Sequence, residues 1–131
     1  MQVVLDTSFL LTCAKQKIDF VSIANEKINE EIKWIVPNEV IGELKELSSR
    51  KGLRGKDKDS AKLALELLKM VNPEFIDVKN RHVDEGIAQF VKDKDVVVAT
   101  LDKKLKGRIG NRILVIKDFR DLEIINQSLK K

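Results

Sequence analysis

Apolar residues along this chain follow two patterns: short consecutive runs, and longer stretches in which they recur every three or four positions. A short run bounded by turn residues is typical of a strand buried on both faces, and the wider spacing is typical of a helix with one face on the core. The runs predict strands at residues 2–5, 33–36, 74–78, 96–101 and 113–116. The spaced stretches predict helices at 8–14, 19–31, 38–49, 61–71, 83–92 and 103–109, and a final helix at 121–129.

Strands and helices therefore alternate along the sequence. This order indicates an α/β fold with a mostly parallel sheet covered on both faces. At 131 residues the chain is long enough to bury a sizeable core, and we expect one domain over 1–131. The apolar positions of 61–71 could complete this core or form a dimer contact.

Two aspartates stand at the ends of predicted strands, where the chain turns into a helix. Asp6 follows the apolar run 3–5, and Asp102 follows the run 96–101. In an open α/β sheet the carboxyl ends of the strands line the crevice in which ligands bind, above all where the strand order reverses. We therefore expect both carboxylates at the ligand-binding edge of the sheet.

Two further acids, Glu43 and Asp84, belong to predicted helices, and their direction follows from about 100° of rotation per residue. Each falls at the border of the apolar stripe of its helix and is expected to lean inward. Their acidic neighbours Glu39, Glu46 and Glu85 fall further round and are expected to face water. Two inward-leaning acids on separate helices, added to two strand-end aspartates, indicate one shared site.

Each acid also has a purely structural explanation. Asp6 and Asp102 could cap the helices that follow them, and Asp84 could stabilise the first turn of its own helix through the macrodipole. Glu43 could be a solvated flank, although no lysine or arginine stands three or four positions away to pair with it. Taken together, four carboxylates close in space would repel one another and resist ionising, so such a cluster usually implies a bound cation.

The composition narrows the choice of cation and the setting. His82 is the single histidine and Cys13 the single cysteine, which excludes histidine-rich and multi-cysteine metal sites. The hard oxygen ligands that remain suit Mg²⁺ or Mn²⁺. Cys13 stands in the apolar stretch 10–14, which predicts a buried thiol. No stretch is apolar for long enough to span a bilayer, so we expect a cytoplasmic protein without a membrane partner.

Charge is unevenly distributed along the chain. Residues 1–43 carry a net −3 and residues 44–131 a net +7. Basic groups beside a carboxylate centre suit a polyanion whose phosphate must reach the cation, and a solvated lysine-rich surface is the alternative. Aromatic residues are scarce, so base stacking should contribute little to recognition. The side chains expected to bind such a polyanion are Lys103, Lys104, Lys106 and Arg108 after Asp102, with Arg50 and Arg54 in a glycine-containing loop.

Four segments of the chain resemble the PIN domain, a small metal-dependent ribonuclease fold. They are VVLDTSFLL at 3–11, VPNEVIGEL at 36–44, VDE at 83–85 and VATLDKKL at 98–105, in the order and at spacings that suit the family. The last segment and the residues that follow it are similar to the branch of archaeal and eukaryotic ribosomal-RNA processing endonucleases. Toxins of bacterial and archaeal toxin–antitoxin pairs share the same kind of acidic quartet.

The resemblance implies a three-layer α/β/α fold with a central parallel five-stranded sheet in the order 3-2-1-4-5, counted along the chain. It implies endonucleolytic hydrolysis of single-stranded RNA, a homodimer, and pre-ribosomal proteins or an antitoxin as partners. A role for Glu85 stays open, because the third segment has Asp-Glu where many relatives have two aspartates. The implied catalytic and metal-binding residues are Asp6, Glu43, Asp84 and Asp102, with Ser8 and Thr100 supporting the cation or its waters.

Three other interpretations remain open at this stage. A toxin would keep the same chemistry in a different biological role. An aspartate-nucleophile phosphatase usually has a second aspartate two residues after the first, where this chain has Ser8, and a phospho-receiver domain has an extra acidic pair that is missing here. An RNA-binding assembly module could keep the fold with a weakened site, although all four acids are retained.

Overall fold

The computed structural model describes residues 1–49, 55–118 and 120–127. Its centre is a six-stranded sheet in the order β3-β2-β1-β4-β5-β6, in which the first five strands are parallel and β6 runs antiparallel to β5. The predicted order of the five parallel strands is confirmed. The strands are β1 (Gln2–Leu5), β2 (Lys33–Pro37), β3 (Glu74–Ile76), β4 (Val97–Ala99), β5 (Ile113–Lys117) and β6 (Asp121–Ile125).

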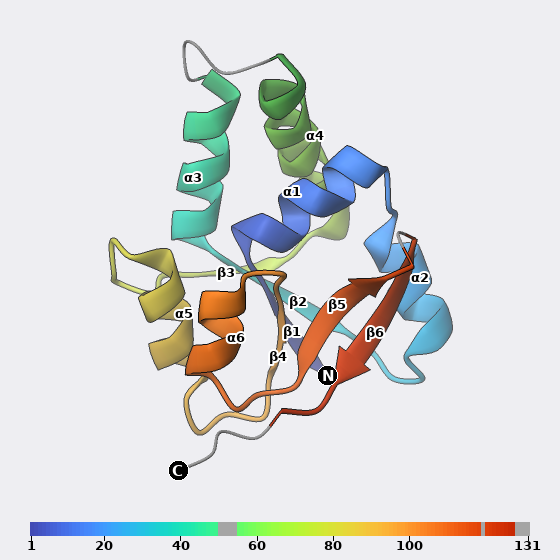
Figure 1. Ribbon diagram of the computed structural model, residues 1–131, viewed down its shortest axis with the longest axis vertical. Helices are drawn as coiled ribbons and strands as arrows, with labels where there is room; N and C mark the ends of the chain where they lie inside the picture. Colours follow the sequence, from blue (N-terminus) through green and yellow to red (C-terminus); the bar gives the residue numbers. More distant parts are fainter. Residues whose placement is uncertain (50–54, 119, 128–131) are drawn as a thin grey trace.

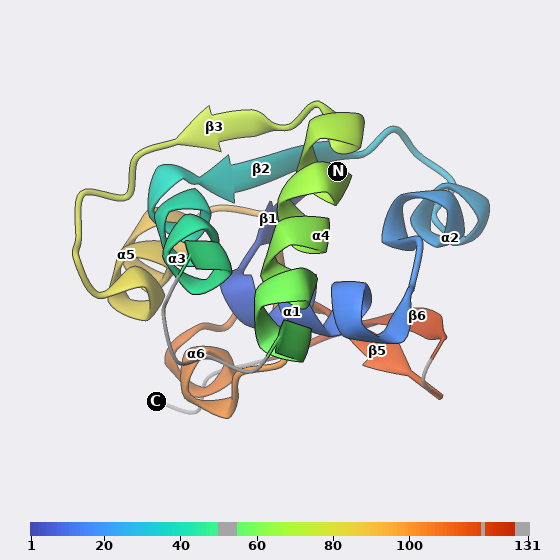
Figure 2. The ribbon, with the colours of Figure 1, turned by 90° about the horizontal axis from the view of Figure 1, so that it is seen from above.

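Helices flank this sheet on both sides. Helices α1, α3 and α4 form one packed group, while α5 and α6 lie side by side apart from it (Figures 1 and 2). Right-handed crossovers explain the two groups. From β1 to β3 the chain runs toward one edge of the sheet, and from β4 to β5 it runs toward the other edge, so the connecting helices fall on different sides of the sheet. The helices are α1 (Thr7–Gln16), α2 (Phe20–Lys27), α3 (Asn38–Ser49), α4 (Gly55–Val71), α5 (Val83–Val91) and α6 (Lys103–Arg108).

The predicted helix at 121–129 is wrong over its described residues, because 121–125 form the edge strand β6, and residues 128 and 129 lie outside the described part of the chain. In this segment Leu122 is buried and Ile124 packs against the core, while Asp121 and Glu123 alternate with them. That period of two is a strand pattern, and the pairing with β5 decides the outcome. An ion pair between Lys27 of α2 and Asp121 ties the start of this strand to the rest of the molecule.

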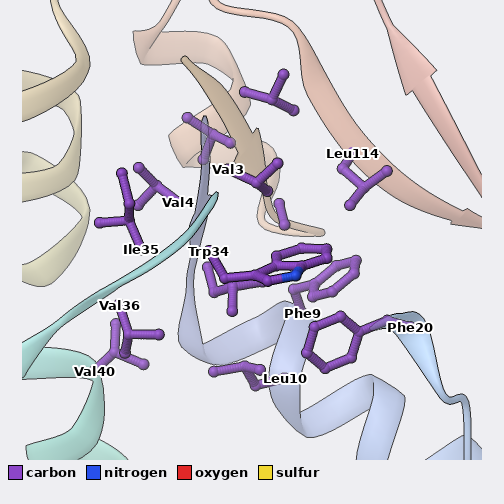
Figure 3. Packing of buried hydrophobic residues seen from close by; sticks show 14 of the residues in the cluster. Val3, Val4, Phe9, Leu10, Phe20, Trp34, Ile35, Val36, Val40 and Leu114 are labelled. Atoms are coloured by element: carbon purple, nitrogen blue, oxygen red, sulfur yellow. The ribbon is translucent and has the colours of Figure 1, made fainter. Parts of the chain in front are cut away.

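The core contains valines from the central strands and an aromatic cluster from three elements (Figure 3). Phe20 of α2 lies between Phe9 of α1 and Trp34 of β2, with ring centroids 5.6 Å and 5.1 Å apart and near-perpendicular planes. Edge-to-face pairs of this kind stabilise a core beyond the area that they bury. Cys13 is fully buried as predicted, and burial raises the pKa of its thiol to about 12.

Helix α4 begins before the predicted 61–71 and completes the core beside α1 and α3. Ala61, Ala64 and Leu68 are buried, which favours the core over the dimer contact for these apolar positions. Met70 of the same helix is 84% exposed. No helix in the described part of the chain is long and apolar enough to cross a membrane.

Candidate functional site

The central strands β1 and β4 bring two of the predicted acids to one edge of the sheet. Leu5 and Ala99 are partners in the parallel register, and the backbone N–H of Asp6 donates to the carbonyl of Ala99 at 3.2 Å. Strand order reverses between β1 and β4, so a crevice opens at their carboxyl ends. Asp6 and Asp102, which follow these strands, both line the cavity found there.

Asp6 is buried, and several hydrogen bonds fix its carboxylate. It is the N-cap of α1, where Oδ1 accepts from the N–H of Phe9 at 2.9 Å and from the hydroxyl of Ser8 at 2.9 Å. Its Oδ2 accepts from the hydroxyl of Thr100. Burial nevertheless raises the pKa of Asp6 to about 6, because these bonds offset only part of the cost of removing a charge from water and the charge of Asp84 adds to that cost.

Ser8 and Thr100 also join the ends of the two central strands. The hydroxyl of Ser8 accepts from the N–H of Leu101 at 3.1 Å, and the hydroxyl of Thr100 accepts from the N–H of Asp102 at 3.0 Å. Asp102 in turn caps α6, with Oδ1 accepting from the N–H of Lys104 at 2.8 Å. The capping explanations for both aspartates are therefore correct, and they hold the two carboxylates at the same edge.

Glu43 approaches the site from α3. Its side chain is exposed rather than inward-leaning, but Oε1 accepts from the hydroxyl of Thr7 at 2.6 Å. Glu39 does not face water as predicted, because it accepts from the N–H groups of Val78 and Lys79 at 3.3 Å and 3.2 Å. Helical rotation alone cannot find such a partner, since the segment after β3 comes from a distant part of the sequence.

Asp84 lies in the first turn of α5, where the charges of two other site acids act on its carboxyl. Burial raises its pKa to about 6, together with a hydrogen bond to Asp102 and the negative charges of Asp102 and Glu43, whereas Arg108 lowers it. Since Asp84 also raises the pKa of Asp6, the four carboxylates share one electrostatic environment. Repulsion of this kind is what a bound cation would relieve.

One cavity of about 680 Å³ joins these groups. Of the predicted RNA-binding residues, Lys104 and Arg108 line it, one helical turn apart on α6, and Lys103 and Lys106 do not. Arg50 and Arg54 lie outside the described residues. The lining residues are Asp6, Thr7, Ser8, Leu11, Glu43, Glu46, Arg81, His82, Val83, Asp84, Glu85, Asp102, Lys104 and Arg108.

Several of these residues were not predicted from the sequence. Glu85 was expected to face water, but it lines the cavity and pairs with Arg108 at 3.5 Å. Arg81 and His82 belong to no recognised motif, and the structure adds Thr7 through its contact with Glu43. One sign of this role was present in the sequence, which is that Thr7 is a polar residue directly after Asp6.

The donor set fits a hard divalent cation. All four acids supply carboxylate oxygens to one cavity, and oxygen ligands are those that Mg²⁺ and Mn²⁺ prefer. Among the described residues, no three histidine, cysteine or carboxylate side chains converge closely enough to form a preformed ligand set. A cation would therefore have to draw Glu43, Asp84 and Asp102 toward the fixed carboxylate of Asp6.

The fold is a mostly parallel α/β sheet, and its acidic cavity lies where the strand order reverses. These two features are the ones by which the chain can be assigned to a class of proteins. Residues 3–121 match the family described as PIN like domain. The chain therefore belongs to the PIN-like domain family, as its resemblance indicated.

Two similar proteins agree with this membership over nearly their whole lengths. Ribonuclease VapC4 of Methanocaldococcus jannaschii is 30% identical over 127 residues, which cover 94% of this chain and 95% of that protein. The structure of the PIN domain endonuclease Utp24 superposes with a TM-score of 0.77 at 26% identity, covering 98% of this chain and 96% of that one.

Proposed function

We propose that this protein is a metal-dependent endoribonuclease that hydrolyses phosphodiester bonds of single-stranded RNA. The observation that carries the proposal is the shared cavity of Asp6, Glu43, Asp84 and Asp102, in which burial and neighbouring carboxylates raise the pKa of Asp6 and of Asp84. Membership of the PIN-like family and the similarity to a ribonuclease and an endonuclease support the reaction class. The metal that fits the donors is Mg²⁺ or Mn²⁺.

The carboxylates have different tasks in this mechanism. Asp6 would be the fixed ligand of the cation, because Ser8, Thr100 and the N–H of Phe9 hold both of its oxygens. Asp84, half-buried beside the other acids of the cavity, would accept a proton from the attacking water. A bound divalent cation would lower the pKa of water and neutralise charge on the phosphate.

Basic side chains of α6 hold the substrate in the same mechanism. Lys104 and Arg108 line the acidic cavity and attract the phosphate that the acids alone would repel. Water attacks phosphorus as its proton passes to Asp84, the bond from phosphorus to the leaving ribose oxygen breaks, and that oxygen takes up a proton. Removing the charge of Lys104 should weaken RNA binding and leave cation binding intact.

The test is cleavage of a labelled single-stranded RNA by the wild type and by Asp84→Asn, with Mg²⁺, with Mn²⁺ and with EDTA. The expected result is internal cutting that requires the metal and falls by more than about 10²-fold in the variant, since even residues that only orient metal ligands are worth about 10–100-fold. Asp118→Asn is the matched control, because Asp118 is an exposed aspartate that does not line the cavity.

Equal cutting by Asp84→Asn and Asp118→Asn would contradict the proposed site. Cutting by the wild type that persists in EDTA would contradict the metal. If wild type cuts no RNA in any condition, the interpretation as a non-catalytic RNA-binding module is favoured instead.

The biological role that we propose first is ribosomal-RNA processing, which rests on the resemblance of residues 98–109 to the processing branch. The second candidate is a toxin that uses the same chemistry. The similarity to the Utp24 endonuclease and to ribonuclease VapC4 supports the chemistry that the two roles share. Growth arrest on expression, relieved by a small antitoxin encoded beside this gene, would identify a toxin. Tolerated expression together with pre-ribosomal RNA as the cut substrate would identify a processing enzyme.

A further inference from the structure

A second cavity adjoins the acidic one and is not explained by the four carboxylates. Its volume is about 870 Å³, and it lies between the end of α5, the loop before β4 and the residues after α6. Arg108 lines both cavities, so they meet at this side chain. The second cavity lies at the amino ends of β4 and β5, so a strand held at the acids would reach it by running along α6 past Arg108.

The second cavity is basic, with an apolar floor. Lys92, Lys94, Arg108 and Arg112 face two aspartates around it, which leaves an excess of positive charge. Lys94 already has a partner in the protein, because its ammonium lies 4.2 Å from the centre of the Phe90 ring in a cation–π contact. The floor includes Ala88, Val96 and Ile109. Cations above apolar surface suit a phosphate with its sugar and base.

The two arginines are held by weak ion pairs. Arg112 approaches Asp95 at 3.5 Å, and the side chain of Asp95 is 94% exposed. Arg108 approaches Glu85 at the same distance, with both side chains about half exposed. Exposed pairs of this kind contribute little to stability, so both guanidiniums can exchange a carboxylate for a phosphate at low cost.

The walls of the second cavity are fixed before any ligand arrives. The side-chain amide of Asn111 donates to the carbonyls of Val91, Lys94 and Val96 at 3.2, 2.9 and 3.1 Å. The amide of Gln127 donates to the carbonyl of Asn111 at 3.2 Å. A site built on a rigid frame binds its ligand with a smaller ordering cost on the protein side.

We infer that this second cavity is a flanking subsite, which binds the nucleotide next to the scissile bond and its phosphate through Arg108, Arg112 and Lys92. The inference rests on the proposed function, because it assumes that the acidic cavity cuts RNA. Its occupant is the same RNA strand, since Arg108 lines both cavities and the positive charge of the second complements phosphate. The strand then extends beyond the cleavage point, as internal cutting requires.

The experiment measures the affinity of fluorescent single-stranded RNAs of two and eight nucleotides, in EDTA so that no cutting occurs, at two salt concentrations. Wild type is compared with Arg112→Gln and with Lys33→Gln. Lys33 is the matched control because it also forms an ion pair with an acid, Glu74, at 2.9 Å but lies outside both cavities. Lys92→Gln tests the subsite from α5, should Arg112→Gln fail to fold.

Arg112→Gln is expected to bind the octamer about three- to tenfold more weakly than Lys33→Gln, with the slope of log affinity against log salt reduced by about 0.7, because one phosphate contact is lost. The dinucleotide should bind both variants equally. Octamer affinity within twofold of the Lys33→Gln value would overturn the inference, as would an equal loss for both RNA lengths.

A polyglutamate peptide separates RNA binding from general attraction of anions. Loss of peptide affinity as large as loss of RNA affinity would mark a general anion patch, a protein partner would then be the better occupant, and the inference would be overturned. If wild type cuts RNA but Arg112→Gln binds normally, only the flanking subsite fails. If wild type neither binds nor cuts RNA, the proposed function fails with it.

Discussion

Asp6 combines a structural role and a chemical one in a single buried carboxylate. Its capping bond to Phe9 and its bonds to Ser8 and Thr100 were partly foreseeable, because an aspartate before a helix is a common N-cap. The Thr100 contact depends on β1 and β4 lying side by side, which the sequence indicated only through the family resemblance. Asp6 is held firmly, yet its ionisation opposes folding.

The raised pKa of Asp6 makes a prediction about stability in EDTA. A carboxyl whose pKa rises from 3.8 to about 6 on folding stabilises the native state below pH 3.8, and this contribution is lost as the pH rises through 6. Asp6→Asn should therefore be more stable than wild type at pH 7 by about 1–3 kcal/mol. Urea unfolding at pH 4 and pH 7 measures the difference.

The difference between the two proteins should be smaller or reversed at pH 4, where Asp6 is protonated in the native state. A variant that is less stable than wild type at pH 7 would show that the lost hydrogen bonds outweigh the removed charge.

Thr7 is the residue that sequence reasoning missed and the structure supplies. Its hydroxyl orients Glu43 across two helices at 2.6 Å. Thr7→Val should lower the affinity for Mn²⁺ and the rate of RNA cleavage by about 10–100-fold, the usual effect of losing a partner that orients a ligand. Thr7→Ser, which keeps the hydroxyl, should retain most of both. Equal loss in the two variants would indicate a packing role for the methyl group.

At the scale of elements, the position of each helix determines where its acid lies in the site. Helix α5 packs so closely on the segment after β3 that a Cβ at Gly86 would lie 2.5 Å from Cγ2 of Val78. A glycine two residues after Asp84 is therefore needed for the close approach of that helix. The sequence showed Gly86 inside a helical pattern without indicating which neighbour required it.

Two helical glycines near site acids give a matched pair of variants. Gly86→Ala should destabilise the protein by about 1–3 kcal/mol through overpacking and should slow cleavage by displacing Asp84. Gly42→Ala, next to Glu43 and with nothing within 4 Å of the added Cβ, should stabilise it by about 0.5–1 kcal/mol. Thermal unfolding of both variants checks the sign, and two losses of similar size would contradict this account.

The element boundaries show where sequence reasoning works and where it stops. Strands β1, β2, β4 and β5 were recognisable, because short buried apolar runs have few alternatives. Strand β3 was also predicted, although it is largely exposed and ends at Ile76 rather than at residue 78. The segment 121–125 was assigned to a helix, because its short apolar pattern does not exclude one and only pairing with β5 settles it. The directions predicted for the side chains of Glu39 and Glu85 were wrong for a similar reason, since their partners come from other elements.

At the scale of the whole molecule, the strand order creates the site. Reversal between β1 and β4 brings residues nearly a hundred positions apart to one edge, and α3 and α5 add one acid each. The sequence predicted this meeting through the family resemblance and the strand-end aspartates. It could not predict the second cavity, which depends on how the end of α5, the loop before β4 and the residues after α6 meet.

Cation binding should increase the free energy of unfolding of the whole protein. Mn²⁺ binds only the folded arrangement of carboxylates, so at about 100 times its dissociation constant it should stabilise wild type by about 2.7 kcal/mol. Asp84→Asn should lose most of this gain, and Asp118→Asn should keep it. A thermal midpoint that responds to Mn²⁺ equally in both variants would place the cation elsewhere.

The most direct measurement compares the rate of RNA cleavage in Mn²⁺ for wild type and four single variants: Asp6→Asn, Glu43→Gln, Asp84→Asn and Asp102→Asn. A fifth variant, Glu66→Gln, changes an exposed acid of α4 outside the acidic cavity and serves as the control. We predict that each of the four loses more than about 10²-fold while the control cuts normally. Wild-type rates in the four amide variants would contradict the assignment of this cavity as the active site.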